Sequence, residues 1–173
     1  MKKLTLILAA ILSVAALHTK AQTDSATTRR IINAQNFLFT ATSANPMSSS
    51  DINRIMSRMP GNTGSNINLT GSNYDLRITK DSVLAYLPYY GRSFTPSMNP
   101  DDAGTKFNSK KFKYTSTNKK KNWTIVIDPQ DVKDSQRMTL YVTENGYATL
   151  TVNNSNRQSI SYNGYISEVK PKK

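Results

Sequence analysis

Carboxylates are the side chains of this chain that are most able to catalyse a reaction. The sequence has 11 Asp and Glu residues, one histidine and no cysteine. Because that histidine, His18, lies in an N-terminal segment that we expect to be removed, composition excludes thiol and serine–histidine catalysis and the usual histidine or cysteine metal sites. A carboxylate-dependent hydrolase remains as an alternative, with Asp81 and Asp101 as its best candidates. Most carboxylates fall in predicted turns or at strand ends, so we predict no catalytic residue and a protein that is not an enzyme.

Three of these carboxylates, Asp128, Asp131 and Asp134, recur at a spacing of three and offer the oxygen ligands that calcium prefers. The segment lacks the glycine and the terminal glutamate of an EF-hand loop, and Lys133 adds an opposing charge. The pattern therefore favours a polar loop between strands. We predict no metal-binding residue and no cofactor.

The densest non-random cluster is the segment from Tyr86 to Arg92, which reads YLPYYGR. Its aromatic rings and its cation suit a surface that binds sugars or peptides. The alternative is that the rings cover the mouth of the core. Arg157 either hydrogen-bonds carbonyl groups of a neighbouring turn or faces the ligand. The candidate ligand-binding residues are Tyr86, Tyr89, Tyr90, Arg92 and Arg157.

Positive charge is unevenly distributed in a chain whose formal net charge is +12. Six lysines gather in one short stretch: Lys110, Lys111, Lys113, Lys119, Lys120 and Lys121. One interpretation is a solvated strand edge, since lysines commonly protect exposed edges from aggregation. The other is contact with an anionic partner. In an exported protein we expect that partner to be an envelope glycan, a lipid headgroup, an acidic peptide or an envelope protein. Nucleic acid is not expected, because the stretch lacks arginine-rich, base-reading character.

The N-terminal segment 1–21 has the layout of a secretory signal peptide, with Lys2 and Lys3 before an uncharged apolar run from Leu4 to Leu17. We expect cleavage between Ala21 and Gln22, which places the mature domain at 22–173. The absence of cysteine excludes a cysteine-anchored lipoprotein, and no second apolar run is long enough for a transmembrane segment. The expected location is therefore periplasmic or secreted.

Two helices are predicted near the N-terminus and strands elsewhere. Capping side chains over 24–28 predict a short helix through Ile32, and apolar residues at helical spacing predict another over 51–59, with a loop over 61–72. Alternation of apolar and polar residues predicts strands at 37–46, 74–79, 83–87, 107–117, 122–128, 138–143, 148–152 and 160–166. A turn at Lys80-Asp81 and a type I′ turn at Asn145-Gly146 separate neighbouring strands.

Sequential strands with short turns favour an antiparallel meander. We predict one mostly-β domain, with an α+β arrangement as the alternative. It has roughly seven or eight strands that form a partly open barrel or a curled sheet, and one or two N-terminal helices.

Three blocks of this chain resemble an uncharacterised exported family of Gram-negative bacteria, domain-of-unknown-function family 4251 (DUF4251). They are the segments 86–92 (YLPYYGR), 145–152 (NGYATLTV) and 156–164 (NRQSISYNG). Tyr90 stands where phenylalanine is more common in the family. The resemblance spans nearly the whole mature chain in the same order, and it implies an exported envelope protein with a compact β-rich domain. No catalytic residue transfers from it.

Together these features predict an exported, non-catalytic, envelope-associated binding module for an anionic or glycan-type ligand. The first alternative is a structural protein that docks a partner through an exposed strand edge. The second is the carboxylate-dependent hydrolase. The oligomeric state does not follow from the sequence.

Overall fold

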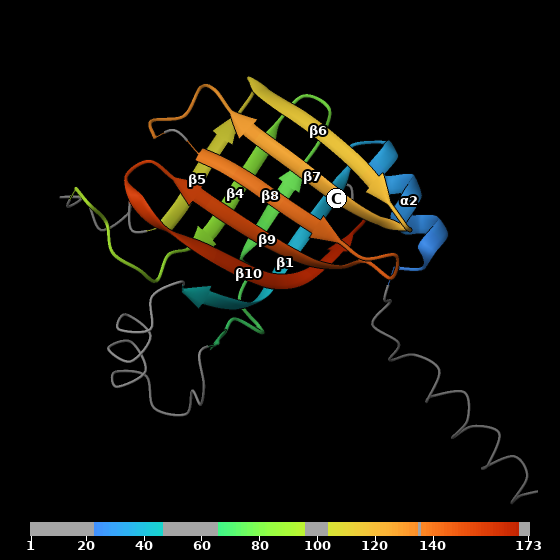
Figure 1. Ribbon diagram of the computed structural model, residues 1–173, viewed down its shortest axis with the longest axis horizontal. Coiled ribbons are helices and arrows are strands. Elements are labelled where there is room, and N and C mark those ends of the chain that lie inside the picture. The colour runs from blue at the N-terminus through green and yellow to red at the C-terminus, as the bar shows by residue number, and fades with distance from the viewer. Residues whose placement is uncertain (1–22, 47–65, 96–103, 135, 170–173) are drawn as a thin grey trace, which may run out of the picture.

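A computed structural model describes residues 23–46, 66–95, 104–134 and 136–169 (Figure 1). These residues form one helix and ten strands. In chain order the elements are α2 (Ser25–Asn33), β1 (Phe37–Pro46), β2 (Ile67–Asn68), β3 (Asp75–Ile78), β4 (Val83–Pro88), β5 (Gly104–Ser109), β6 (Phe112–Lys119), β7 (Asn122–Pro129), β8 (Gln136–Val142), β9 (Tyr147–Asn154) and β10 (Arg157–Ser167). The mostly-β, antiparallel prediction is confirmed, but the expected seven or eight strands are in fact ten.

Two differences from the predicted elements account for the two additional strands. The single strand predicted over 107–117 is two strands, β5 and β6, separated by Lys110 and Lys111. The carboxylate of Asp131 accepts hydrogen bonds from both lysine amides, so a residue distant in sequence stabilises this break. The loop predicted over 61–72 contains β2, whose two residues pair with Ser43 and Ala44 of β1. The helix predicted over 51–59 and the cleavage site at Ala21 and Gln22 lie outside the described residues.

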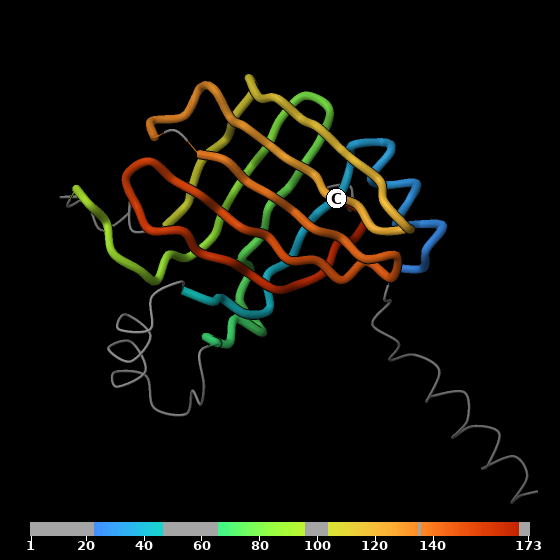
Figure 2. The backbone as a smooth tube through the Cα atoms, viewed as in Figure 1, coloured from blue at the N-terminus to red at the C-terminus, as the bar shows by residue number. Residues whose placement is uncertain are grey.

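All the strands belong to one antiparallel sheet with the order β5-β4-β3-β1-β10-β9-β8-β7-β6, and β2 pairs with β1. Figure 1 shows that the half from β6 to β10 lies across the half formed by β1, β3, β4 and β5, with the strands of the two halves running in clearly different directions. The tube in Figure 2 shows the last strand beside the first, where the two halves meet. The sheet is thus a flattened, nearly closed barrel whose two edges, β5 and β6, follow one another in the chain.

The core lies between the two halves and follows the predicted alternation. Every second residue of β7, and of the central parts of β8, β9 and β10, is buried, as the sequence indicated for Trp123, Leu140 and Ile166. Tyr162 is fully buried, and its hydroxyl donates a 2.5 Å hydrogen bond to the carbonyl oxygen of Pro88. That bond joins β10 to the end of β4 across the core and positions the tyrosine-rich segment that follows Pro88.

Helix α2 confirms the predicted N-terminal helix. Asp24 is its N-cap: the carboxylate accepts a 2.7 Å hydrogen bond from the Thr27 amide, and this bond lowers the pKa of Asp24. Ile31 and Ile32 are buried in the core, while Arg30 on the other face pairs with Glu168. In Figure 1 the helix lies at one side of the barrel, opposite β5.

The predicted turn at Lys80-Asp81 does join β3 to β4, but the β8–β9 and β6–β7 turns do not follow the sequence signals. At Asn145-Gly146 only the glycine has positive φ (+80°), and the Gly146 amide donates to the Thr143 carbonyl, so this is a three-residue loop rather than the predicted type I′ turn. The β6–β7 turn has positive φ at both central residues, Lys120 (50°) and Lys121 (68°), with Lys119 paired to Asn122. The type I′ geometry therefore occurs where two lysines, which have no intrinsic preference for it, are forced into it by the strand register.

We expect the double substitution Lys120→Asn and Lys121→Gly to stabilise the protein by about 1 kcal/mol, because asparagine and glycine adopt positive φ more readily than lysine. The ion pair of Lys121 with Glu144 that is lost is exposed and contributes little. Equilibrium urea unfolding measures the effect. The matched control is Lys119→Asn, outside the turn centre; equal stability of the double variant and this control would contradict the argument.

Stability should fall above pH 10, because two tyrosines are held in their neutral form. Burial raises the pKa of Tyr114 to about 12 and raises that of Tyr162 well above its usual value. A folded-state pKa above the unfolded value means that the full stability is present below pH 10 and is lost as pH rises further, by up to about 1.4 kcal/mol per pH unit for each tyrosine. Urea unfolding between pH 8 and 11.5 should show this loss. The stability of the Tyr162→Phe variant should fall less steeply with pH. A pH dependence equal to that of the parent protein would show that Tyr162 does not cause the loss.

Candidate functional site

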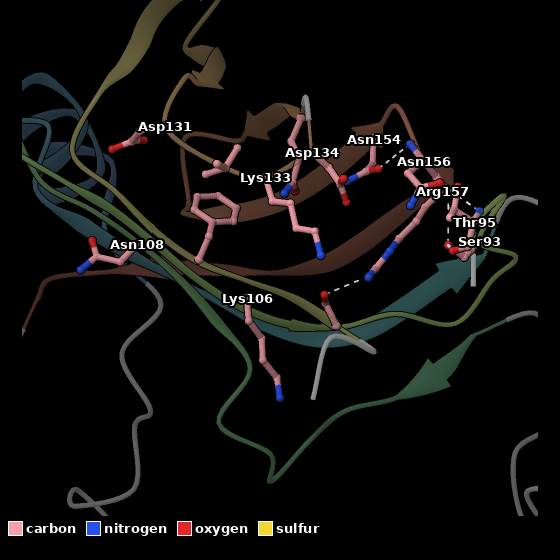
Figure 3. Close-up of a pocket in the computed structure, with 14 residues that line it drawn as sticks. Ser93, Thr95, Lys106, Asn108, Asp131, Lys133, Asp134, Asn154, Asn156 and Arg157 are labelled. Carbon is pink, nitrogen blue, oxygen red and sulfur yellow. Dashed lines mark hydrogen bonds between the residues drawn. The ribbon is translucent and has the colours of Figure 1, made fainter. Parts of the chain in front are cut away.

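A polar cavity of about 550 Å³ lies on the side of the barrel away from α2, between β5 and the turns that join β7 to β8 and β9 to β10 (Figure 3). It opens here because β5 is an edge strand that pairs only with β4 among the described strands. Its lining includes Lys106, Lys133, Asp134, Gln136, Asn154 and Arg157.

Arg157 is the best-anchored cation of the cavity. Its Nη1 donates a 2.9 Å hydrogen bond to the carbonyl oxygen of Gly104, and its guanidinium lies 5.2 Å from the centre of the Tyr89 ring. The β9–β10 turn that carries it is braced by Asn154, whose side-chain oxygen accepts from the Asn156 amide at 2.7 Å. Arg157 therefore bridges the two halves of the sheet.

Lys133 and Asp134 come from the β7–β8 turn. In Figure 3 Lys133 extends toward the side of the cavity where Arg157 lies, whereas Lys106 points away from both. The ammonium of Lys106 is 5.2 Å from the centre of the Tyr86 ring on the outer surface. Two cations thus face the interior of the cavity, and the third belongs mainly to the outer face.

Amide side chains supply most of the remaining polar lining. Asn108, Asn154 and Asn156 line the cavity, and the side-chain oxygen of Gln136 is buried without a hydrogen-bond partner among the described residues. A buried acceptor that lacks a partner is costly unless water or a ligand satisfies it. The cavity can therefore donate and accept hydrogen bonds at several points.

Asp131 has a structural role in the turn that it faces. Its carboxylate accepts hydrogen bonds from the Ser109 hydroxyl and from the amides of Lys110 and Lys111, at 2.9 and 3.2 Å for the two amides. These bonds, that from Ser109 foremost, lower the pKa of Asp131. A general acid needs the opposite shift, so Asp131 serves as an acceptor that holds the β5–β6 turn.

The tyrosine-rich segment is divided between the inside and the outside of the barrel. The Tyr89 hydroxyl donates to the carbonyl oxygens of Arg92 (2.8 Å) and Gln158 (3.0 Å), so this tyrosine ties β10 to the segment after β4. Tyr90 packs against the core, and burial raises its pKa. Tyr86 is 44% exposed on the outer face and stacks on Tyr74 at 5.6 Å.

The other predicted site residues are placed apart from the cavity. The side chain of Arg92 is exposed, and none of the three tyrosines lines the cavity. Of the hydrolase candidates, Asp81 lies in the exposed β3–β4 turn and Asp101 lies outside the described residues. The six lysines lie in two groups at opposite ends of the edge strand β6, with Lys110, Lys111 and Lys113 at its start and Lys119, Lys120 and Lys121 at its end. Of the residues that line the cavity, Arg157 was among the predicted site residues, whereas Lys133 and the amides were not.

Two further properties concern the described part of the chain. It contains no group of three His, Cys, Asp or Glu side chains that could hold a metal ion, and Asp128 is instead paired with Arg137 at 2.8 Å. Within the same ranges no helix is both long and apolar enough to cross a membrane.

Comparison with known proteins gives a family and a fold. A family model described as "Domain of unknown function (DUF4251)" matches residues 19–166. Among solved structures, the chain is similar to a DUF4251 family protein from Bacteroides eggerthii, with a TM-score of 0.54 and 14% sequence identity. That match covers 86% of this chain and 89% of the other, and it shows a shared fold. No curated protein matches the sequence.

Proposed function

The chain belongs to the DUF4251 family, which is defined without an activity, so we propose its function from its own geometry. It is an exported, non-catalytic module of the cell envelope. It binds an anionic, glycan-type ligand in the cavity beside Arg157. The observation that carries this proposal is the placement of Arg157 and Lys133 on the lining of one polar cavity. Export rests on the signal-like segment 1–21.

The size and lining of the cavity suit a small polar ligand. Its volume of about 550 Å³ lies within the usual range for ligand sites, roughly 300–1,000 Å³. Most such sites are mainly apolar, whereas this one is lined largely by charged and amide side chains. Amides that donate and accept at once match the neighbouring hydroxyl groups of a sugar. A saccharide of one or two residues is therefore the ligand class that this lining favours.

The charge of the lining favours an acidic saccharide over a neutral one. Lys133 and Arg157 line the cavity with Asp134, while the carboxylate of Asp131 is already occupied by the β5–β6 turn. The guanidinium of Arg157 is held by Gly104 and by the Tyr89 ring, so its position is fixed before a ligand arrives. A carboxylate or sulfate on the sugar would contact this fixed cation.

The hydrolase alternative has one observation in its favour, since two carboxylates, Asp131 and Asp134, line the cavity. Glycoside hydrolysis needs one carboxyl group as a general acid with a raised pKa, opposite a second across the bond that breaks. Asp131 has a lowered pKa, and Figure 3 shows it well apart from Asp134. Binding without turnover is the function that this arrangement supports. Release of sugar that disappears in Asp134→Asn would favour the hydrolase instead.

Binding should be visible in a thermal-shift assay with digalacturonic acid as an acidic probe and galactobiose as its neutral counterpart. A ligand at about 100 times its Kd adds roughly 2.7 kcal/mol of stability. We expect a shift with the acidic disaccharide that shrinks as salt rises, because exposed charges are screened. A shift with the neutral sugar alone would assign the site to uncharged glycans, and no shift with either would contradict the proposal.

The Lys133→Gln variant should bind digalacturonic acid about two- to fivefold more weakly, which is the contribution of one exposed ion pair. Because Lys133 is exposed, its own contacts contribute little to stability, so the melting temperature without ligand should change little. Lys80→Gln removes an equally exposed charge in the β3–β4 turn and serves as the matched control. Isothermal titration calorimetry compares the two variants, and equal affinities would exclude Lys133 from the site.

A further inference from the structure

The long edge strand β6 is a second feature with the properties of a binding surface. It has eight residues and pairs with β7 on one side, while no described strand pairs with its other side. Thr115, Ser116, Thr117 and Asn118 are all exposed. An edge of this kind presents backbone donors and acceptors that can pair with another extended chain.

The register shows which backbone groups are available. Lys119 and Asn122 flank a two-residue turn and therefore form a hydrogen-bonded pair, and such pairs alternate along an antiparallel ladder. The odd-numbered residues of β6 thus bond to β7. The amide and carbonyl groups of Tyr114, Ser116 and Asn118 point outward instead.

Charge along this edge favours one kind of partner. Lys113 and Lys119 lie six residues apart on the outer face, and the residues between them carry no charge. Neither lysine forms an ion pair within the described part of the chain. Asp128, the residue opposite Lys113 on β7, is already held by Arg137 in a two-point contact. An extended segment with carboxylates six residues apart would place one opposite each lysine.

The same charges disfavour a second copy of this chain. Antiparallel pairing of two β6 strands centred on Ser116 would set Lys113 of each copy opposite Lys119 of the other. Like charges directly opposite one another destabilise a strand pair. The charges on this edge therefore disfavour pairing of two β6 strands but permit pairing with an acidic strand.

We propose that β6 binds an acidic, extended segment of another protein by antiparallel strand addition, with the outward groups of Tyr114, Ser116 and Asn118 as backbone partners and Lys113 and Lys119 as the charge contacts. This surface is separate from the cavity beside Arg157, so the proposal stands independently of the ligand proposed there.

The test uses the blocked heptapeptide Glu-Val-Thr-Ser-Thr-Val-Glu, with the same peptide carrying lysine at both ends as its counterpart. We expect the acidic peptide to bind saturably, as measured by NMR from shifts of the β6 amide resonances. Ser116→Pro removes an outward amide without breaking a bond to β7 and should abolish this binding. Ser116→Ala keeps the amide and should leave binding intact.

A charge reversal provides a second variant that does not alter the backbone. The double substitution Lys113→Glu and Lys119→Glu should weaken binding of the acidic peptide by about tenfold and should strengthen binding of the lysine peptide. The proposal is overturned if Ser116→Pro binds as well as the parent protein, if the acidic peptide shows no saturable binding, or if sedimentation equilibrium shows a dimer that Ser116→Pro dissociates.

Discussion

The Gly164→Ala variant should lose about 3 kcal/mol of folding stability, because the close approach of β1 leaves no space for a side chain at this position. Gly164 lies in the middle of β10, opposite Ala41 of β1. A Cβ atom at Gly164 would overlap the carbonyl oxygen of Thr40 and would lie 2.9 Å from its carbonyl carbon and 3.0 Å from Cε2 of Phe39. Two of these atoms are backbone, so the sheet would have to move.

The position is sensitive because it joins the two halves of the barrel. The β1–β10 register shifts between Ala41 and Ser43, next to the close approach at Gly164. Urea unfolding of Gly164→Ala and of Ser161→Ala, a change on the same strand at a partly exposed position, gives the comparison. A loss below about 1 kcal/mol for Gly164→Ala would show that β1 can shift freely, contrary to the close packing described here.

The Arg157→Ala variant should bind digalacturonic acid at least about tenfold more weakly than the parent protein, which corresponds to roughly 1.4 kcal/mol. It should also lose about 1–2 kcal/mol of stability, because the bond to the Gly104 carbonyl and the contact with the Tyr89 ring disappear together. Both effects come from one side chain that bridges the two halves of the sheet beside the ligand.

Arg157→Lys separates charge from geometry. Lysine keeps the charge but lacks the planar fork of arginine, so we expect affinity between those of Arg157→Ala and the parent protein. Calorimetric titration at equal salt measures the series. If Arg157→Ala lost stability but bound the acidic disaccharide with unchanged affinity, Arg157 would be a brace between strands and no part of the ligand site.

Local alternation was sufficient to predict most of the barrel. The buried positions of β7, β8, β9 and β10 are those that the period of two indicated, because one face of each strand meets the core. The failures were nonlocal. The break between β5 and β6 depends on Asp131, and β2 exists only because Ile67 and Asn68 reach β1. The lysine turn is dictated by the register of β6 and β7 rather than by its residues.

The site was less accessible to sequence reasoning than the fold. Arg157 could be proposed because it precedes a clear strand beside polar turn residues, and Tyr89 because it lies in a dense aromatic cluster. Lys133 gave no comparable signal, since it is one charge in a loop of mixed charges. Its relevance comes from the folding of the sheet, which brings the β7–β8 turn to the same cavity as β5 and the β9–β10 turn.

The most direct test of the proposed function is to locate bound digalacturonic acid by NMR on the isotope-labelled protein. We predict that saturable changes in amide resonances gather at Lys133 and Arg157 and at the turns that carry these two inward-facing cations. Galactobiose at the same concentration should give smaller changes at these positions. Changes confined to the outer tyrosines Tyr74 and Tyr86, or the absence of any saturable change, would contradict a ligand site in the cavity beside Arg157.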